Sequence, residues 1–354
     1  MDSWSYPELN GPPIVLGRSI YFVDILRKAI DKVDQESSTS TLLELHEACS
    51  NEVKDLEMCL LVQAADEVLL VMVDNEGHHF SSTVLKNPVT GGLVSPLELS
   101  SPVPLELDPC DGTVERRGSA LHQIHFEDNK VCLRVTDVQT SSSSRTVDFP
   151  KYNGIPNELT VSFSHGDRDF VFQPRTLFLT WFDHDDKMSY EAKLPASHKV
   201  RQLARDYDLC RTAMCPSSDT VYTLYSLRRM AEVASAPKTP LLVATNLETL
   251  EVARVNLDFG NSGHIPCVDV HLTIKDSTLY ICGKCAEYPL LCKNTHIYTF
   301  ELETLPMEAN SQGACHDCHQ EAGERWSCSQ CDYAFCASCA VKLHQHRRKI
   351  FDRK

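Results

Sequence analysis

The most constraining feature of this chain is a run of cysteines and histidines near its C-terminal end. Three Cys-x2-Cys pairs and a closing His-x-His fall between residues 315 and 346. The predicted zinc ligands are Cys315, Cys318, Cys328, Cys331, Cys336, Cys339, His344 and His346. Eight sulfur and nitrogen ligands suffice for two tetrahedral zinc sites. The gaps of nine and four residues between the pairs are too short for a separate loop around each ion, so they predict a cross-braced, two-zinc finger.

In such a module the first and third cysteine pairs hold one ion, and the second pair and the two histidines hold the other. His316 and His319 are rival ligands because they lie beside the first pair. A disulfide framework would need an oxidising compartment. The first residues have no basic start and no apolar core, so we expect no secretory signal. The ten other cysteines are scattered, and we expect a reducing cytoplasm or nucleus.

The stretch 325–340 resembles known zinc-finger families. Like a ZZ-type finger, it has an aromatic residue, Trp326, two positions before the third cysteine, an Asp-Tyr pair after the fourth, and the closing His-x-His. Its short gap before Cys336 is similar to the divergent Cys/His-rich finger common in plants, and B-box fingers are a looser match. ZZ fingers bind the free amino end of peptides partly through acidic residues, so the resemblance implies a peptide site at Asp332, Trp326 and Tyr333.

Two departures from the ZZ pattern leave another interpretation of the finger open. The gap from Cys331 to Cys336 is one residue shorter than in most ZZ fingers, and Ala334 stands where they usually carry a second Asp. Under the alternative, Trp326 and Tyr333 only pack the small core of the finger, and the finger caps the rest of the chain.

Composition restricts the partners of the chain. The 354 residues carry a formal net charge of −15, which argues against a nucleic-acid partner for the main body. Residues 1–314 hold 27 Lys/Arg against 44 Asp/Glu, a formal charge of −17, whereas the tail from residue 315 is mildly basic. No apolar run approaches the ~20 residues of a membrane-spanning helix, so we expect no membrane association.

Short strands separated by polar turns dominate residues 12–306. Apolar pairs recur at intervals of about 50 residues, a spacing typical of propeller blades built from four strands. These positions are Ile20-Tyr21, Leu69-Leu70, Leu121, Leu177-Phe178, Val221-Tyr222 and Leu279-Tyr280. The string Leu-Glu-Thr-Leu also occurs twice, at 247–250 and 302–305, each time after a strand-like segment.

This pattern resembles a degenerate kelch-type β-propeller, without the double glycine of well-formed kelch repeats. We therefore predict an all-β chain with a propeller of about six blades over residues 12–306, a linker over 307–314 and the zinc finger with its basic tail over 315–354. An irregular pair of β-sandwiches is the alternative fold.

Two further groups of residues could in principle hold a metal ion. Cys282, Cys285, Cys292 and His296 form a Cys3His set, but the alternative is that the cysteines are ordinary strand residues. The run Asp183-His184-Asp185-Asp186-Lys187 has hard oxygen ligands without calcium-loop spacing, so a solvated hairpin tip is the preferred interpretation.

No catalytic signature is present among the common nucleophile, metalloprotease, P-loop and dinucleotide motifs. We therefore predict a protein that is not an enzyme and that acts as an interaction or adaptor protein, with a protein or peptide as its partner. One alternative is an accessory or substrate-recognition component of ubiquitin ligation, as the B-box likeness suggests. The other is an enzyme whose active site lies in propeller loops.

Overall fold

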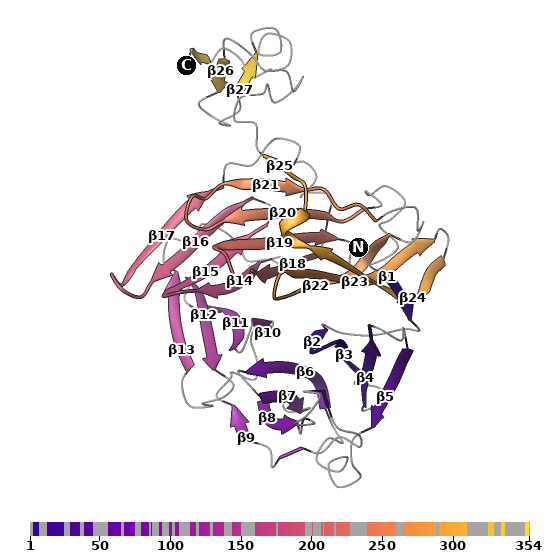
Figure 1. Ribbon diagram of the computed structural model, residues 1–354. Helices are drawn as coiled ribbons and strands as arrows, with labels where there is room; N and C mark the ends of the chain where they lie inside the picture. The colour runs from indigo at the N-terminus through magenta and orange to yellow at the C-terminus, as the bar shows by residue number, and fades with distance from the viewer. Residues whose placement is uncertain are drawn as a thin grey trace.

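A computed structural model gives the fold of this chain (Figure 1). It describes residues 3–6, 13–24, 29–35, 39–44, 56–64, 67–74, 79–84, 86, 92–93, 99–100, 103–105, 114–117, 120–127, 130–137, 144–149, 160–174, 176–194, 200, 207, 209–215, 217–226, 239–259, 265–287, 290–309, 325–328, 334–336 and 351–353. No helix within these ranges is long and apolar enough to cross a bilayer.

Six antiparallel sheets follow one another along the chain as the blades of a β-propeller (Figure 1). Blade 1 comprises β2 (Ile14–Leu16), β3 (Ser19–Asp24), β4 (Ala29–Asp34) and β5 (Thr39–Glu44). Blade 2 comprises β6 (Leu56–Ala64), β7 (Glu67–Asp74), β8 (His79–Val84) and β9 (Val103–Leu105). Blade 3 comprises β10 (Val114–Arg117), β11 (Ala120–Glu127), β12 (Lys130–Asp137) and β13 (Ser144–Phe149).

The second half of the chain forms the other three blades. Blade 4 comprises β14 (Val161–His165), β15 (Arg168–Gln173), β16 (Phe178–Asp183) and β17 (Met188–Lys193). Blade 5 comprises β18 (Leu209–Met214), β19 (Thr220–Ser226), β20 (Leu241–Asn246), β21 (Val252–Val255) and an added fifth strand, β25 (Met307–Ala309). Blade 6 comprises β22 (Pro266–Lys275), β23 (Thr278–Glu287), β24 (Leu290–Glu301) and β1 (Ser3–Tyr6).

A short turn and a small sheet complete the described chain. A 3-10 turn, η2, covers Leu302–Thr304 directly after β24. A separate three-stranded sheet contains β26 (Arg325–Cys328), β27 (Ala334–Cys336) and β28 (Phe351–Arg353), with β26 in the middle. This small sheet lies inside the predicted zinc finger.

The propeller ring closes in blade 6, where a strand from the start of the chain pairs with a strand from the end of the body. β1 pairs antiparallel with β24, so that Ser3 lies opposite Tyr298 and Tyr6 lies opposite Thr295. The outermost strand of the last blade therefore comes from the start of the chain. This pairing joins the first and last parts of the body and ties blade 6 to the segment that leads into blade 1.

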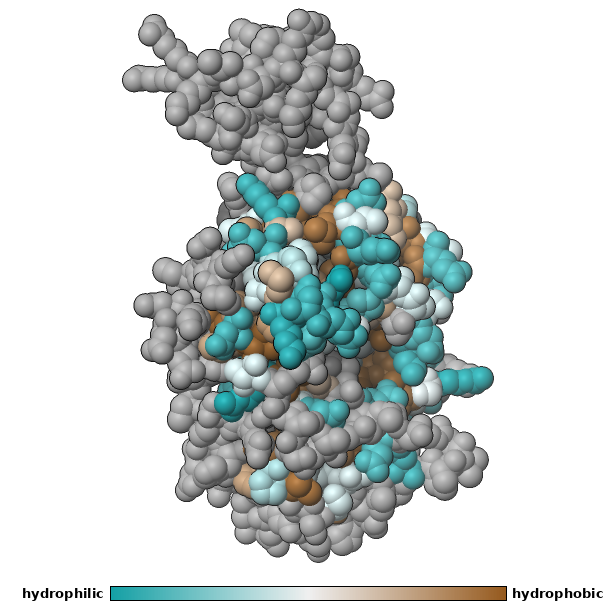
Figure 2. Space-filling model, turned by 90° about the vertical axis from the view of Figure 1, so that its left-hand side faces the viewer, coloured by the Kyte–Doolittle hydropathy of each residue, from teal (hydrophilic) through white to brown (hydrophobic). Residues whose placement is uncertain are grey.

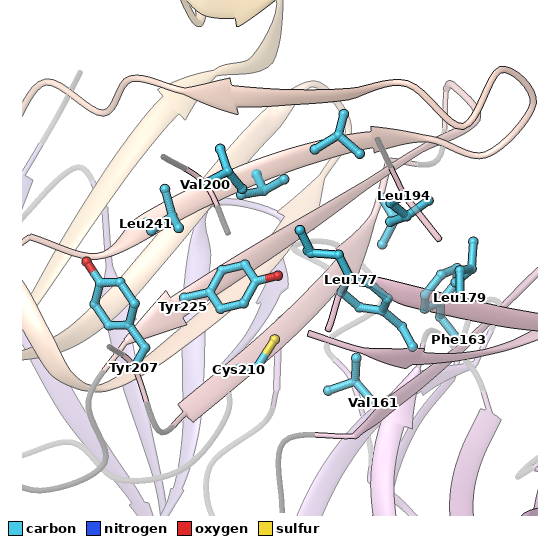
Figure 3. Close-up of a cluster of buried hydrophobic side chains, with 14 of the residues drawn as sticks. Val161, Phe163, Leu177, Leu179, Leu194, Val200, Tyr207, Cys210, Tyr225 and Leu241 are labelled. Carbon is cyan, nitrogen blue, oxygen red and sulfur yellow. The ribbon is translucent and has the colours of Figure 1, made fainter. Parts of the chain in front are cut away.

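The core consists of six hydrophobic clusters, one at each interface between adjacent blades. The cluster between blades 6 and 1, for example, joins Ile20 and Phe22 to Ile297. The other five join blades 1 and 2, 2 and 3, 3 and 4, 4 and 5, and 5 and 6. Figure 3 shows the largest of these, where Phe163 and Leu179 of blade 4 pack with Tyr225 and Leu241 of blade 5. Six interfaces for six blades make a closed ring.

Burial of both faces of each sheet explains the apolar runs in the sequence. In β7, Leu69 and Val71 pack toward blade 3, whereas Val68, Leu70 and Met72 pack toward blade 1. Successive side chains of a strand point to opposite faces. A strand in the middle of a propeller blade therefore needs apolar residues at consecutive positions rather than at alternate ones.

A recurring backbone hydrogen bond connects the two turns at one end of a blade. The residue just after the third strand donates its N–H to a carbonyl in the turn between the first and second strands. The four described cases are Gln35 to Arg18, His184 to Asp167, Leu247 to Asp219 and Leu302 to Ser277, at 3.2, 2.9, 2.7 and 2.8 Å. The two Leu-Glu-Thr-Leu strings occupy this same position in blades 5 and 6, which accounts for the internal repeat.

The prediction of an all-β propeller with about six blades is confirmed. Five of the six recurring apolar positions lie in the second strand of a blade, namely in β3, β7, β11, β19 and β23. The sixth is displaced: Leu177 precedes the third strand of blade 4, and the second strand, β15, instead carries Phe170 and Val171. β15 begins with Arg168 and Asp169, so its apolar run is only three residues long, 170–172.

The strand bounds differ from the predicted limits of the body at both ends. β1 lies before residue 12, and β25 lies within the predicted linker, where it pairs with β21. Met307 is opposite Val255, and Ala309 is opposite Ala253. Both strands add to the outside of a blade, where a short segment needs only backbone hydrogen bonds to one neighbour. The division into a body and a finger itself stays a prediction.

Candidate functional site

Polar side chains gather at one end of blade 4, where the turn between β14 and β15 lies next to the turn between β16 and β17. The N–H of His184 donates to the carbonyl of Asp167 at 2.9 Å, which fixes the two turns against one another. The side chains at this end divide between the two faces of the blade. Those of β14 at odd positions face blade 5, and those at even positions face blade 3, because successive residues of a strand alternate.

On the side toward blade 5, an ion pair anchors the β16–β17 turn. Arg168 Nε donates to Asp183 Oδ2 at 2.8 Å, and the N–H of Asp185 donates to Asp183 Oδ1 at 3.1 Å. The hydrogen bond from Arg168 lowers the pKa of Asp183 below its usual value. The predicted hairpin tip at 183–187 is therefore present, but Asp183 is largely buried and paired rather than solvated.

The same turn positions an exposed tyrosine. Asp186 accepts the N–H of Met188 at 2.9 Å on one carboxylate oxygen and the hydroxyl of Tyr190 at 2.5 Å on the other. The hydrogen bond to Asp186 raises the pKa of Tyr190. Met188 and Tyr190 are 55% and 37% exposed. We call the group Asp183, Asp185, Asp186, Met188 and Tyr190 the blade 4 rim.

A row of aromatic rings supports the blade 4 rim from inside the blade. Phe163 stacks on Phe170 with ring centres 4.9 Å apart, Phe170 on Trp181 at 6.2 Å, and Trp181 on Tyr190 at 5.5 Å. One ring comes from each of the four strands at the same register. The position of Tyr190 is therefore fixed by stacking on one side and by the hydrogen bond to Asp186 at its tip.

On the side toward blade 3, a buried chain of hydrogen bonds joins two blades. The Ser164 hydroxyl donates to Asp169 Oδ1, and His184 Nε2 lies 2.7 Å from Asp169 Oδ2. Ser164 Oγ is also 3.3 Å from His122 Nε2, whose Nδ1 is 3.2 Å from Ser162 Oγ. Since Ser164 donates to Asp169, it accepts from His122, and His122 Nδ1 then accepts from Ser162.

This buried chain has the residue types of a catalytic triad but not its accessibility. His122 and Ser162 are 1% exposed, and Asp169 is fully buried. A nucleophile and its base must both reach a substrate. Ser164 is partly exposed, but His122, the base in contact with it, is buried and does not. These hydrogen-bonded side chains therefore act as a polar brace that joins blades 3 and 4. Between blades 4 and 5, the pair of His165 Nε2 and Asp219 Oδ1, at 2.6 Å, spans the interface at its exposed edge.

Cys215, which follows β18 in the turn of blade 5, has an unusual environment for a buried thiol. Burial raises its pKa, but hydrogen bonds from the hydroxyls and backbone N–H groups of Ser217 and Ser218 outweigh burial and lower it overall. The Cys215 Sγ to Ser217 Oγ distance is 3.3 Å. Cys282 shows the opposite behaviour, because complete burial among apolar residues raises its pKa.

The candidate metal set Cys282, Cys285, Cys292 and His296 is not brought together by the described residues. Cys282 packs in the cluster between blades 6 and 1. Cys285 lies three residues further along β23, at a register shift in its pairing with β24, and does not belong to that cluster. Among the residues that the structure describes, no group of three or more His, Cys, Asp or Glu side chains could hold an ion. The side chain of Cys292 lies outside them.

The predicted zinc ligands fall almost entirely outside the described residues. Cys328 ends β26, and Cys336 ends β27, where it lies opposite Arg325. The other six ligands and the rivals His316 and His319 lie outside the described ranges, as do Asp332 and Tyr333 of the predicted peptide site. Trp326 is in β26, opposite Phe335.

Sequence reasoning missed the residues that make the rim and the brace. Arg168, Met188 and Tyr190 belong to no motif, and His122 and Ser162 are separated by 40 residues. Only the run of acidic residues at 183–186 gave a signal, and it was interpreted as a solvated turn.

No protein-family model matches the chain, and no curated protein matches it. Solved structures are similar in fold. A member of the DUF4221 family from Bacteroides vulgatus is 10% identical, with a TM-score of 0.47, over 87% of this chain and 97% of that one. A luciferin-regenerating enzyme is 9% identical, with a TM-score of 0.46, over 87% and 98%. The Trypanosoma rangeli sialidase is 9% identical, with a TM-score of 0.48, over 83% and 55%.

These structures correct one prediction made from the sequence. The missing catalytic motifs led us to predict that the chain is not an enzyme. That prediction is wrong, because missing motifs do not exclude an enzyme with this fold. The similar structures include a luciferin-regenerating enzyme and a sialidase. Propeller active sites can be assembled from separate loops, which short motifs do not report. At this identity the likeness shows the fold alone and assigns no activity.

Proposed function

We propose that this chain is a protein-interaction protein that uses the blade 4 rim as one binding surface and a two-zinc C-terminal finger as another. The observation that carries the proposal is the exposed Tyr190, which is held rigid by Trp181 and Asp186. Exposed aromatic and methionine side chains in a fixed position are enriched at protein interfaces and dominate their binding energy. A rigid side chain also loses little conformational entropy when a partner binds.

An affinity capture experiment with three baits tests the proposal. The baits are the intact chain, a version truncated after Gln312, and the intact chain with Tyr190→Ser; all recovered proteins are quantified by mass spectrometry. Partners of the finger should be lost from the truncated bait, and partners of the rim should be lost from the Tyr190→Ser bait. Identical recovery with all three baits would overturn the proposal.

The arrangement of strands supports two separate zinc ions in the finger. Cys328 lies one residue beyond the Ser327–Ala334 pair, and Cys336 lies opposite Arg325. The two cysteines are therefore about three residues apart along the ladder, or roughly 10 Å at ~3.4 Å per residue. Two thiolates on one zinc each lie about 2.3 Å from the ion. This separation favours placing Cys328 and Cys336 on different ions, as cross-bracing requires.

The finger is proposed to read the free amino end of a peptide. Asp332 would pair with the terminal ammonium group, and Trp326 and Tyr333 would cover the first side chain. In that case Asp332→Ala should abolish binding of an unblocked peptide without changing the zinc content. Acetylation of the peptide should have the same effect, and equal affinity for free and acetylated peptides would favour a finger that only caps the body.

We further propose a reducing compartment, the cytoplasm or the nucleus. Six cysteine side chains of the body that the structure describes are buried and form no disulfide: Cys132, Cys210, Cys215, Cys267, Cys282 and Cys285. Disulfides are rare in cytosolic and nuclear proteins, so buried cysteines outside disulfides support this proposal.

A further inference from the structure

The outer edge of blade 4 offers backbone groups to another chain. β17 is the last strand of its sheet and has a described neighbour, β16, on one side only. The Leu194 N–H donates to the Leu177 carbonyl at 2.8 Å, which makes that pair a hydrogen-bonded one. Bonded and non-bonded pairs alternate in antiparallel sheets. The N–H and C=O groups of Ser189, Glu191 and Lys193 therefore point away from β16.

The side chains of β17 suit a binding edge rather than a protected one. Proteins usually blunt exposed edges with charged residues, proline or bulges. β17 contains no proline and pairs with β16 without any register shift. Its two charged residues, Glu191 and Lys193, lie on the face opposite Met188 and Tyr190, because successive side chains alternate. On one face it presents Met188 and Tyr190, which are two of the five exposed large hydrophobic side chains in the described structure.

The charge at this edge selects the kind of partner. Asp183 is paired with Arg168, and the exposed carboxylates of Asp185 and Asp186 outnumber the exposed Lys187 at the start of β17. Along the strand the charges of Glu191 and Lys193 offset each other, so the edge carries a small negative excess. Figure 2, seen from the side on which β16 and β17 lie in Figure 1, shows hydrophilic residues gathered over the middle of this face. A second copy of the chain, with its formal net charge of −15, would be repelled. A basic segment would be attracted.

The molecule already uses strand addition at two other blades. β25 adds to the outer strand of blade 5, and β1 completes the outside of blade 6. Both added strands come from outside the run of strands that forms the blade, and both are antiparallel. The outer edge of a blade in this propeller can therefore accept an extended segment of three or four residues.

We infer that β17 binds an extended segment of a partner protein as an added antiparallel strand, and that this segment carries lysine or arginine. Its backbone pairs with Ser189, Glu191 and Lys193, an apolar side chain covers Met188 and Tyr190, and a basic side chain lies beside Asp185 and Asp186. The inference rests on the proposed function, because it presumes that the partner is a protein, and it names the chemistry that the rim recognises.

A peptide-binding experiment on the full chain tests the inference. The probe is a short fluorescent peptide of alternating valine and lysine. Its amino end is acetylated, so that a finger that binds free amino ends does not bind it. Fluorescence anisotropy should show binding of this peptide and none of the matching valine–glutamate peptide. Hydrogen exchange of the 188–193 amides should slow when the valine–lysine peptide binds.

Two variants of Glu191 separate the effect of the outward backbone N–H from the effect of the side-chain charge. Glu191→Pro removes an outward N–H without removing a hydrogen bond to β16, and proline is tolerated at such edge positions. It should weaken binding about tenfold, since one or two lost hydrogen bonds of roughly 1 kcal/mol each approach the 1.4 kcal/mol of a tenfold change. Glu191→Ala, which removes only the charge, should change affinity by less than about threefold.

The same interaction can be removed from the side of the peptide, in case Glu191→Pro disturbs the fold. N-methylation of alternate residues of the valine–lysine peptide should abolish its binding to the unmodified chain. Unchanged binding of the methylated peptide, or equal binding of the lysine and glutamate peptides, would overturn the inference. So would a dimer in sedimentation that Glu191→Pro dissociates, because β17 would then pair with a second copy.

The two proposals fail in different ways. If the peptide does not bind but affinity capture still depends on Tyr190, the rim binds a partner by another mode and only strand addition is wrong. If neither depends on the rim, the proposed use of blade 4 is wrong as well.

Discussion

Replacing Gly283 with alanine should destabilise the propeller by steric overlap with the neighbouring strand. Gly283 lies in β23, beside the register shifts that bring β22 close to it. A Cβ at this position would lie 2.9 Å from Val270 Cγ2, 3.1 Å from Val270 Cα and 3.3 Å from Pro266 Cβ. Val270 is fully buried in the cluster between blades 5 and 6, so it has no free space into which to move.

The magnitude follows from two opposing effects of the Gly283→Ala change. Overpacking a dense core costs about 1–3 kcal/mol. Alanine regains about 0.5–1 kcal/mol because glycine loses more backbone entropy on folding. The free energy of unfolding should therefore fall by up to about 2.5 kcal/mol, with about 1 kcal/mol as the central value, which lowers the melting temperature by roughly 2–4 °C in a body of this size.

A matched glycine separates this steric cost from a backbone cost. Gly166 has a φ of +55°, and a Cβ there would meet nothing within 4 Å. Gly166→Ala should cost about 1–2 kcal/mol because alanine disfavours the left-handed region, and Gly166→Asn should cost less because asparagine tolerates it. At Gly283 the order should reverse, since the larger asparagine worsens the overlap.

The test is thermal unfolding followed by circular dichroism, with a double-mutant cycle. Val270→Ala removes the closest atom, so it should recover part of the cost of Gly283→Ala, with a coupling energy of about 1 kcal/mol. Recovery stays partial because Val270 Cα remains at 3.1 Å. A Gly283→Ala chain that melts at or above the wild-type temperature, or single costs that simply add, would refute the reasoning.

Three further outcomes are expected. A chain that ends at Asn310 retains β25 and should melt above one that ends at Pro306, since the shorter chain loses the fifth strand of blade 5; equal melting temperatures would mean that β25 adds nothing. Elemental analysis of the fragment 310–354 should find two equivalents of zinc and, after chelation, no fold, because so short a chain cannot bury a sufficient core; one equivalent, or a folded metal-free fragment, would contradict cross-bracing. Iodoacetamide should label Cys215 before Cys282, and its labelling should begin at a lower pH than that of an ordinary thiol because the Cys215 pKa is lowered; labelling of Cys282 first would contradict this order.

The propeller could be predicted because its repeat is local. Each blade needs one strand of consecutive apolar residues, such as Val68–Val73, and the spacing of these strands is visible in the sequence. Pairing between distant segments could not be predicted in the same way. Neither Ser3–Tyr6 nor Met307–Ala309 is unusually apolar, because each needs only backbone bonds to one neighbouring strand.

The candidate site was less predictable than the fold. Tyr190 stacks on Trp181 only because β16 and β17 pair in a particular register, and register is not a property of any single residue. The Cys-Gly-Lys-Cys string suggested a metal, but Cys282 packs in the apolar cluster between blades 6 and 1, and close packing explains the glycine. For a motif on a strand, the surroundings of each side chain must therefore be known before its chemistry is predicted.

The pairing of β1 with β24 also limits when the propeller ring can close during biosynthesis. About 290 residues separate the two strands, so closing that loop costs about 5 kcal/mol of chain entropy, with (3/2)RT ln n as the measure. At roughly 5–20 residues per second, β1 is synthesised about 15–60 seconds before its partner strand. During that interval the first strand has no native neighbour. The ring can close only as synthesis of the body ends.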